Sequence, residues 1–316
     1  MRLPDRAGLI RAAGAALLAL LAGASAPHPS PGAAVVVRFD ARRILSVEAS
    51  GPADAETGRA VTADDPVRIA SVSKLVVALG VLRLVDEGQL DLDRDVSAYL
   101  GWRLRNPAFP DSAITLRHLL GHRSGLIDGD DRYIVPLGET LRDRLGEPGV
   151  WDGRHPPGGY FRYANFSFPV VASVMEAATG ERFDRLMTRL VMRPLRLDAC
   201  FNWTECSDAA IARAVVLRGA DGTVLRDDLK GRRPACPVVP ARDGSCDLAR
   251  YRPGDNGALF SPQGGLRISM RDLAAIGQMM LANGRGFLSP EGFAELAAPG
   301  RAIAPLGGER DGGFHC

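Results

Sequence analysis

The sequence is nearly without lysine: of its 39 cationic side chains only Lys74 and Lys230 are lysines, and the rest are arginines. It also lacks an excess of either charge, because its acidic residues leave a formal net charge of only +2. A balance this close to zero argues against a nucleic-acid-binding surface, which needs clustered positive charge. After residue 24 no apolar run is long enough to span a bilayer. We therefore expect that the mature chain does not bind nucleic acid and does not span a membrane.

Cysteines are few, and their spacing disfavours a metal site. Cys200 and Cys206 flank one short polar segment, Cys236 and Cys246 flank another, and Cys316 is the last residue. Zinc, the weaker alternative, usually needs two close cysteine pairs or added histidines, and neither pattern is present. The sequence therefore predicts no metal and no other cofactor. Two local disulfides, Cys200–Cys206 and Cys236–Cys246, are the natural pairing in an oxidising compartment.

The first 24 residues have the pattern of a signal peptide. Arg2, Arg6 and Arg11 form a positive start, residues 12–21 form an apolar centre, and residues 22–24 are small enough for a cleavage site. The alternative is a short amphipathic helix. Residues 25–33 are predicted to be a Pro/Ser/Ala linker, followed by one domain over residues 34–316. This pattern, together with the cysteines, predicts a periplasmic or secreted protein.

The stretch around Ser71 and Lys74 is the most informative part of the chain. The nearly continuous apolar run that follows as far as Val85 predicts a buried helix ending at Gly88. Three residues apart, Ser71 and Lys74 lie on one helix face within reach of each other. A desolvated neutral amine can take a proton from a serine, whereas arginine stays protonated and cannot. The pair predicts a nucleophile with its base; the alternative is a surface lysine in the first turn of a helix.

Periodicity and capping signals predict the other elements. Strands are expected at 34–39 and 43–48, helices at 116–120 and 166–178, helical structure at 183–192, a hairpin around 219–223, and helices at 270–281 and from 290 onward. Thr115 and Ser269 are expected to cap the helices that follow them. The polar segment 127–156 is predicted to be a surface excursion.

Two further polar pairs deserve separate interpretations. His122 and Ser124 are poorly placed to pair with each other, which favours a structural turn over part of a catalytic triad.

Tyr163 and Asn165 would point the same way on an extended segment before a helix. A phenol there could relay a proton, and an amide could hold both Lys74 and a substrate carbonyl, although such a pair could also merely order a turn.

Several motifs occur together in a fixed order: Arg68-Ile69-Ala70-Ser71-Val72-Ser73-Lys74, then the turn that begins at Gly88, then residues 119–126, then residues 157–165, and later Gly264-Gly265-Leu266 to Leu273. Their order resembles that of the class C β-lactamase-related serine hydrolases, which include β-lactamases, D-alanyl-D-alanine carboxypeptidases, D-aminopeptidases and esterases. The resemblance covers about residues 34–300.

The resemblance implies a role for each matching residue. Ser71 would be the acylated nucleophile, Lys74 the base, Tyr163 the proton relay and Asn165 a residue that positions the substrate. The implied fold is an α/β (α+β) arrangement of an antiparallel sheet flanked by helices, with an inserted, mostly helical lobe. The expected function is that of a secreted serine hydrolase that cleaves an ester, amide or β-lactam in a small-molecule or peptide substrate; the oligomeric state is not predicted.

One motif of the family has no counterpart here. The third motif, Lys-Thr-Gly or His-x-Gly, lies on a later sheet strand, and the sequence reaches Cys316 first. We therefore expect a C-terminally truncated domain without its last sheet strands, and a poor catalyst, since that strand normally supplies one oxyanion donor. The alternative function is a catalytically impaired fragment, or a non-catalytic member of the fold that binds cell-wall peptide or a partner.

Overall fold

A computed structural model describes residues 32–298 of the chain. The predicted signal peptide, most of the predicted linker and Cys316 lie outside the described residues. In the described part no helix is both long enough and apolar enough to cross a bilayer.

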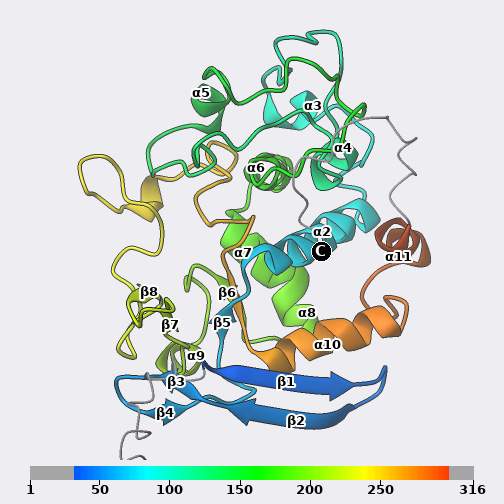
Figure 1. Cartoon of the computed structure of the whole chain (residues 1–316). Helices are drawn as coiled ribbons and strands as arrows, with labels where there is room; N and C mark the ends of the chain where they lie inside the picture. The colour runs from blue at the N-terminus through cyan, green and yellow to red at the C-terminus, as the bar shows by residue number, and fades with distance from the viewer. Residues whose placement is uncertain (1–31, 299–316) are drawn as a thin grey trace, which may run out of the picture.

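The strands pair antiparallel, as expected, but within residues 32–298 they form four short sheets rather than one continuous sheet. The sheets are β1 (Ala34–Phe39) with β2 (Ile44–Ser50), β3 (Pro52–Asp54) with β4 (Arg59–Ala60), β7 (Leu217–Arg218) with β8 (Val224–Arg226), and the three-stranded order β5 (Val67–Arg68), β9 (Leu266–Ile268), β6 (Cys200–Phe201). Figure 1 shows β1 and β2 at one end of the molecule and a mostly helical lobe at the other. The α/β class and the helical lobe are as predicted.

The central helix begins where the sequence places it. A 3-10 turn, η1 (Ala70–Val72), leads directly into α2 (Ser73–Asp86). Val76, Val77, Leu79 and Leu84 on α2 are completely buried, because neighbouring elements cover nearly every face of this helix. The approach is closest at Gly80, where an added Cβ would lie 2.7 Å from the Met187 sulfur. The apolar run therefore forms the core helix of the molecule and fixes residues 71–74 at its start.

Further helices follow along the chain. They are α3 (Ser97–Leu100), α4 (Leu116–Leu120), α5 (Leu141–Leu145), α6 (Ser167–Thr179), α7 (Phe183–Met187), the π-helical η2 (Thr188–Met192), α8 (Arg193–Leu195), α9 (Asp208–Ala212), the 3-10 turn η3 (Leu248–Arg250), α10 (Met270–Leu281) and α11 (Pro290–Ala297). Thr115 and Ser269 accept hydrogen bonds from backbone N–H groups of α4 and α10, which confirms both predicted caps. Helix α10 is seated on the first sheet, where the Gln278 amide donates to the Asp40 carbonyl at 3.1 Å.

The prediction of a surface excursion over 127–156 is wrong. This segment contains α5 and buries Val135, Leu137, Leu145 and Val150 in the main core. Its apolar residues stand singly among Asp, Gly and Pro, so they follow neither the helix nor the strand period that would have revealed burial. The segment forms part of the helical lobe.

Both predicted disulfides are present. Cys200 is bonded to Cys206, with their Cα atoms 5.1 Å apart, and Cys236 to Cys246, with theirs 5.8 Å apart. The first pair is buried beside Trp203 in a small separate cluster, whereas the second closes a surface loop whose cysteines are only partly buried.

Candidate active site

The structure brings Ser71 and Lys74 together at the start of α2. The Lys74 ammonium nitrogen, Nζ, lies 3.1 Å from Ser71 Oγ, within hydrogen-bond distance. Nζ also lies 2.9 Å from Asn165 Oδ1 and 2.7 Å from the carbonyl oxygen of Gln263. Lys74 is only 8% exposed, so these oxygens replace the water that the nitrogen loses on burial. The alternative of a surface lysine is excluded.

Tyr163 and Asn165 reach the same place from the extended segment before α6. The Tyr163 hydroxyl donates to Ser71 Oγ at 2.8 Å, although 92 residues separate the two in sequence. The Tyr163 ring is 42% exposed, and the Lys74 nitrogen lies 5.0 Å from the ring centroid. All four residues singled out from the sequence therefore meet at one point.

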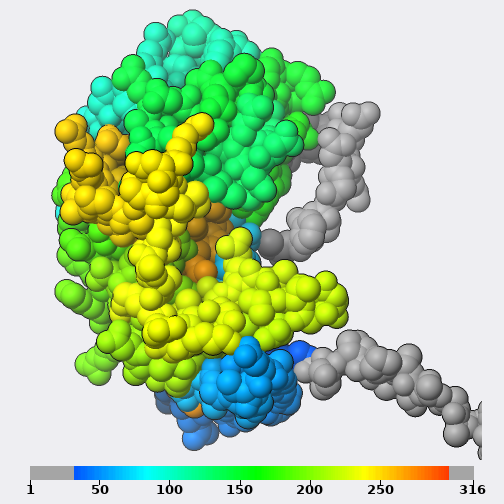
Figure 2. Space-filling view, turned by 90° about the vertical axis from the view of Figure 1, so that its left-hand side faces the viewer, coloured from blue at the N-terminus to red at the C-terminus, as the bar shows by residue number. Residues whose placement is uncertain are grey.

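This geometry places the serine oxygen between an amine and a phenol. A neutral Lys74 could accept the Ser71 proton, and the Tyr163 hydroxyl could carry a proton toward or away from the same oxygen. Figure 2 shows a hollow in the surface between the green helical lobe and the yellow-green β7–β8 region, with orange residues from around position 265 on its floor. Gln263, whose carbonyl accepts from Lys74, lies three residues before β9 (Leu266–Ile268) in the sequence.

His122 supports the tyrosine. Its ring stacks on the Tyr163 ring with centroids 4.5 Å apart and an interplanar angle of 29°. Nδ1 accepts a hydrogen bond from the Ala164 N–H at 3.2 Å, so the proton of the neutral ring lies on the other nitrogen. Burial, with a further contribution from the charge of Lys74, lowers the pKa of His122 to about 4. Ser124 instead lies 3.4 Å from Ser167 Oγ, in keeping with a structural turn at 122–126.

Two contributors to the site had not been predicted. The Gln263 carbonyl belongs to the backbone, and no side-chain pattern could reveal it. Asp128 accepts a hydrogen bond from the Asn165 amide nitrogen at 2.9 Å, and its acidic side chain had been assigned to the supposed surface excursion. Its position two residues after Leu126, at the end of the predicted turn, is the signal that could have drawn attention to it.

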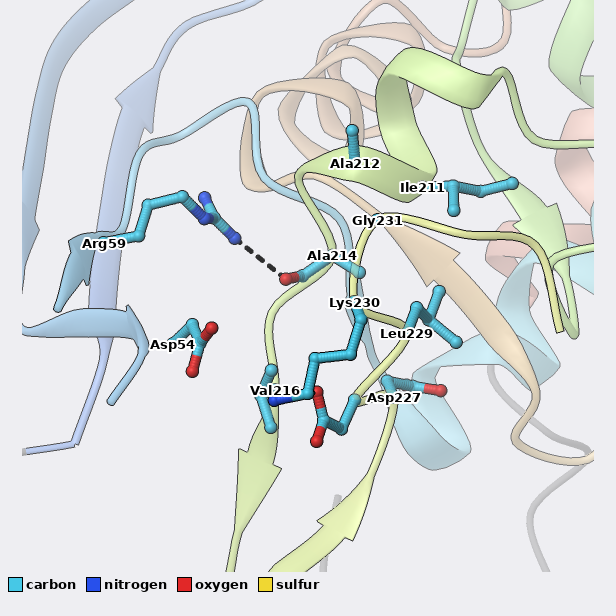
Figure 3. A pocket seen from close by; sticks show the side chains of 11 residues that line it. Asp54, Arg59, Ile211, Ala212, Ala214, Val216, Asp227, Leu229, Lys230 and Gly231 are labelled. Atoms are coloured by element: carbon cyan, nitrogen blue, oxygen red, sulfur yellow. Dashed lines mark hydrogen bonds and ion pairs between the residues drawn. The ribbon is translucent and has the colours of Figure 1, made fainter. Parts of the chain in front are cut away.

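A separate small pocket lies between the β3–β4 hairpin and the loop after β8 (Figure 3). Its cavity volume is about 50 Å³, which holds a few water molecules, whereas ligand pockets have volumes of about 300 Å³ or more. The charges around it are paired: Arg59 with Asp65 at 2.9 Å, and Lys230 with Glu56 at 2.6 Å. We assign no substrate to this pocket.

The fold and the Ser–Lys–Tyr arrangement define a serine hydrolase of the class that contains esterases, penicillin-binding proteins and β-lactamases. The chain belongs to the Beta-lactamase family, whose family model matches residues 18–315. This confirms the family, the fold class and the enzyme class expected from the sequence.

Individual relatives agree with this assignment. The chain is 31% identical over 300 residues to esterase EstB of Burkholderia gladioli, an alignment that covers 88% of this chain and 71% of the esterase. It is 32% identical over 171 residues to penicillin-binding protein 4 of Amycolatopsis lactamdurans, covering 54% of this chain and 44% of that protein. The chain thus spans less than half the length of the second relative.

Solved structures show the same fold. The octameric penicillin-binding protein homologue from Pyrococcus abyssi superposes with a TM-score of 0.61 at 18% identity, covering 90% of this chain and 59% of that one. The class C β-lactamase from Rhodobacter sphaeroides gives a TM-score of 0.59 at 21% identity, covering 91% and 69%.

Proposed function

We propose that the chain is an exported serine hydrolase that cleaves esters through an acyl-enzyme at Ser71. The observation that carries this proposal is the convergence on one serine oxygen of the Lys74 amine and the Tyr163 hydroxyl, at 3.1 and 2.8 Å. A weak nucleophile needs a base within hydrogen-bond distance and a means of protonating the leaving group, and these two groups supply both.

In the proposed reaction, neutral Lys74 removes the Ser71 proton as Oγ attacks the ester carbonyl. When the tetrahedral intermediate collapses, the Tyr163 hydroxyl gives its proton to the departing alkoxide and recovers one from the Lys74 ammonium. A water molecule then attacks the acyl-enzyme while the same base accepts its proton, and that proton returns to Ser71 Oγ. Each proton taken up is released again, so the site ends in its starting state.

Asn165 has two tasks in this scheme. Its Oδ1 accepts from Lys74 and holds the amine beside Ser71. Its amide nitrogen carries two protons, one of which is directed at Asp128, and we assign the other to the substrate carbonyl.

Two observations support an ester with an apolar acyl group. The relative that aligns over 88% of this chain is an esterase. Val72, which follows Ser71 in sequence, is 49% exposed, and Tyr163, which donates to Ser71, is 42% exposed. Phe161, 46% exposed, has its ring 6.0 Å from that of His122, which stacks on Tyr163. Exposed apolar groups of this kind favour an apolar ligand. The two disulfides of the described part are compatible with the export that the N-terminal sequence predicts.

Labelling with a fluorescent alkyl phosphonate, together with turnover of p-nitrophenyl esters, tests this function. We expect peptide mapping to place the label on Ser71, and Ser71→Ala to lose both labelling and turnover while Ser50→Ala, a change at an exposed serine on β2, retains them. The two lysines offer a matched pair: Lys74→Arg should lower turnover by about 10³-fold or more, and Lys230→Arg should not change it. A folded wild-type protein that is neither labelled nor active on esters would refute the proposal.

A further inference from the structure

We propose that Asp128 is a positioning residue that fixes the orientation of the Asn165 amide, so that its oxygen and not its nitrogen faces Lys74. The consequence for catalysis rests on the function proposed above, whereas the orientation itself is a property of the folded chain.

The hydrogen bonds allow one assignment. An ionised carboxylate can only accept, so the Asn165 group that lies 2.9 Å from Asp128 Oδ2 must be the NH2. The oxygen of the same amide then points the other way, 2.9 Å from Lys74 Nζ. The Lys74 ammonium, which can only donate, selects the same orientation from the other side, so the amide is held between an acceptor and a donor.

The second oxygen of Asp128 fixes the backbone at the same place. Oδ1 accepts from the Phe166 N–H at 2.9 Å, directly before α6. Free N–H groups at a helix start favour a negative partner, so Asp128 also stabilises this end of α6. One carboxylate therefore holds both the side chain of residue 165 and the backbone of residue 166.

Asp128 is the last part of a loop that holds the whole segment 162–166. Near the start of this loop the His122 carbonyl accepts from the Arg162 N–H at 2.9 Å, and the His122 ring accepts from the Ala164 N–H. The turn at 122–126 separates the two anchor points. The loop 122–128 thus acts as a template against which Tyr163 and Asn165 are set, which gives the predicted turn a purpose.

The template has an electrostatic consequence for Lys74. The groups facing Lys74 include the Ser71 and Tyr163 hydroxyls, the Asn165 oxygen, the Gln263 carbonyl, the Phe168 ring at 5.4 Å, the neutral His122 ring and, behind Asn165, the Asp128 carboxylate. An amide oxygen and a nearby negative charge both favour the ammonium form. Asp128→Asn removes the charge, and because asparagine carries both a donor and an acceptor it no longer requires the Asn165 NH2 to face it; the lysine should therefore lose its proton at lower pH.

The scarcity of lysine makes this measurable without substrate. Protein labelled with 13C at the lysine ε-carbon should give two resonances, and Lys230→Arg identifies the one from Lys74. We expect Asp128→Asn to lower the pH midpoint of the Lys74 resonance by about 0.5 to 1 unit. Asp130→Asn, the same charge change at an exposed residue just beyond the loop 122–128, should leave the midpoint within about 0.2 unit of the wild-type value.

The Asn165 side-chain amide gives a second readout, whose first part needs no variant to fold. In 15N-labelled wild-type protein, one of its two protons should exchange with water more slowly than those of the exposed Asn283 side chain. In a folded Asp128→Asn variant this protection should be reduced. Equal exchange at the two asparagines in wild type, or equal Lys74 midpoints in Asp128→Asn and Asp130→Asn, would overturn the proposal. If the slow Asn165 proton and the shifted Lys74 midpoint are both observed but the wild-type protein is not labelled by the phosphonate, the proposed function is refuted and this inference stands.

Discussion

Glu176 is the ionisable group whose replacement should change the pH dependence of folding most clearly. It lies on the buried helix α6 and is completely inaccessible to solvent. Its Oε1 accepts from the Phe183 N–H at 2.7 Å, and its Oε2 accepts from the Gly254 N–H at 2.9 Å and from the Tyr251 hydroxyl. Burial outweighs these hydrogen bonds and raises the pKa of Glu176 from 4.5 to about 7, with the charge of Asp184 acting in the same direction.

The sign of the effect follows from proton linkage. Between pH 4.5 and about 7 the folded protein holds a proton on Glu176 that the unfolded chain has released, so stability falls as the pH rises through this window. The interval between the two pKa values corresponds to about 3 kcal/mol. Glu176→Gln cannot ionise and should lose this dependence. At pH 5, where Glu176 is mostly protonated in the folded protein, the variant should be less stable by about 1 to 3 kcal/mol because its NH2 cannot accept one of the three hydrogen bonds.

Urea unfolding at pH 5, 6, 7 and 8 measures the difference in unfolding free energy between wild type and variant. We expect the variant to be less stable at pH 5 and the deficit to shrink by about 3 kcal/mol by pH 8. Subtracting the unfolding free energy of the variant from that of wild type at each pH removes the contributions of the ionisable groups that both proteins share. Glu291→Gln, an exposed change on α11, is the control and should run parallel to wild type. A Glu176→Gln curve that also stays parallel to wild type from pH 5 to 8 would refute the argument.

Two further predictions concern single contacts. The pKa of His122 is lowered to about 4, below its ordinary 6.5, so the neutral ring should contribute fully to stability above pH 6.5 and lose that contribution as the pH falls toward 4. Asparagine tolerates the positive φ of 53° at this position, so His122→Asn should fold and should remove this acid-induced loss of stability. An acid unfolding curve identical to that of wild type would contradict the prediction. Replacing Cys236 and Cys246 by Ser should lower the unfolding free energy by about 2 to 3 kcal/mol under non-reducing conditions. The same change at Cys200 and Cys206 should lower it further because those side chains are buried. Equal losses of unfolding free energy in the two variants would contradict this ranking.

The parts of the structure that local sequence patterns control were predicted. The apolar run of α2, the Thr115 and Ser269 caps and the spacing of Ser71 and Lys74 each depend on residues within a few positions of one another. The meeting of Tyr163 with Ser71 came from the family resemblance, because no rule of spacing connects residues 92 apart. The burial within 127–156 was missed because its apolar residues have no period, and they join a core that also contains residues far away in the sequence.

The Gln263 carbonyl shows why the rest of the site could not be predicted. It reaches Lys74 across 189 residues, and α6 holds the loop that carries it. The Gly257 N–H donates to Ser173 Oγ at 2.9 Å, the Gly254 N–H donates to Glu176, and an added Cβ at Gly257 would lie 2.1 Å from the Pro169 carbonyl oxygen. Only glycine permits so close an approach, and the buried Ser173 and Glu176 on this mostly apolar helix are the side chains that satisfy the loop backbone.

Helix α6 therefore aligns both sides of the site. The segment just before it carries Tyr163 and Asn165 and is fixed by Asp128, while its buried polar side chains seat the loop that ends at the Gln263 carbonyl. A polar residue buried in an apolar helix must find a partner, and here the partner is the backbone of the loop beside Lys74. Because Asp128 holds Asn165 and Glu176 holds the loop that leads to Gln263, a displacement of either contact should change the surroundings of Lys74 before it unfolds the protein. The 13C resonance of Lys74 in Glu176→Gln examines this link, and a resonance identical to that of wild type from pH 5 to 8 would show that the loop keeps its position without the carboxylate.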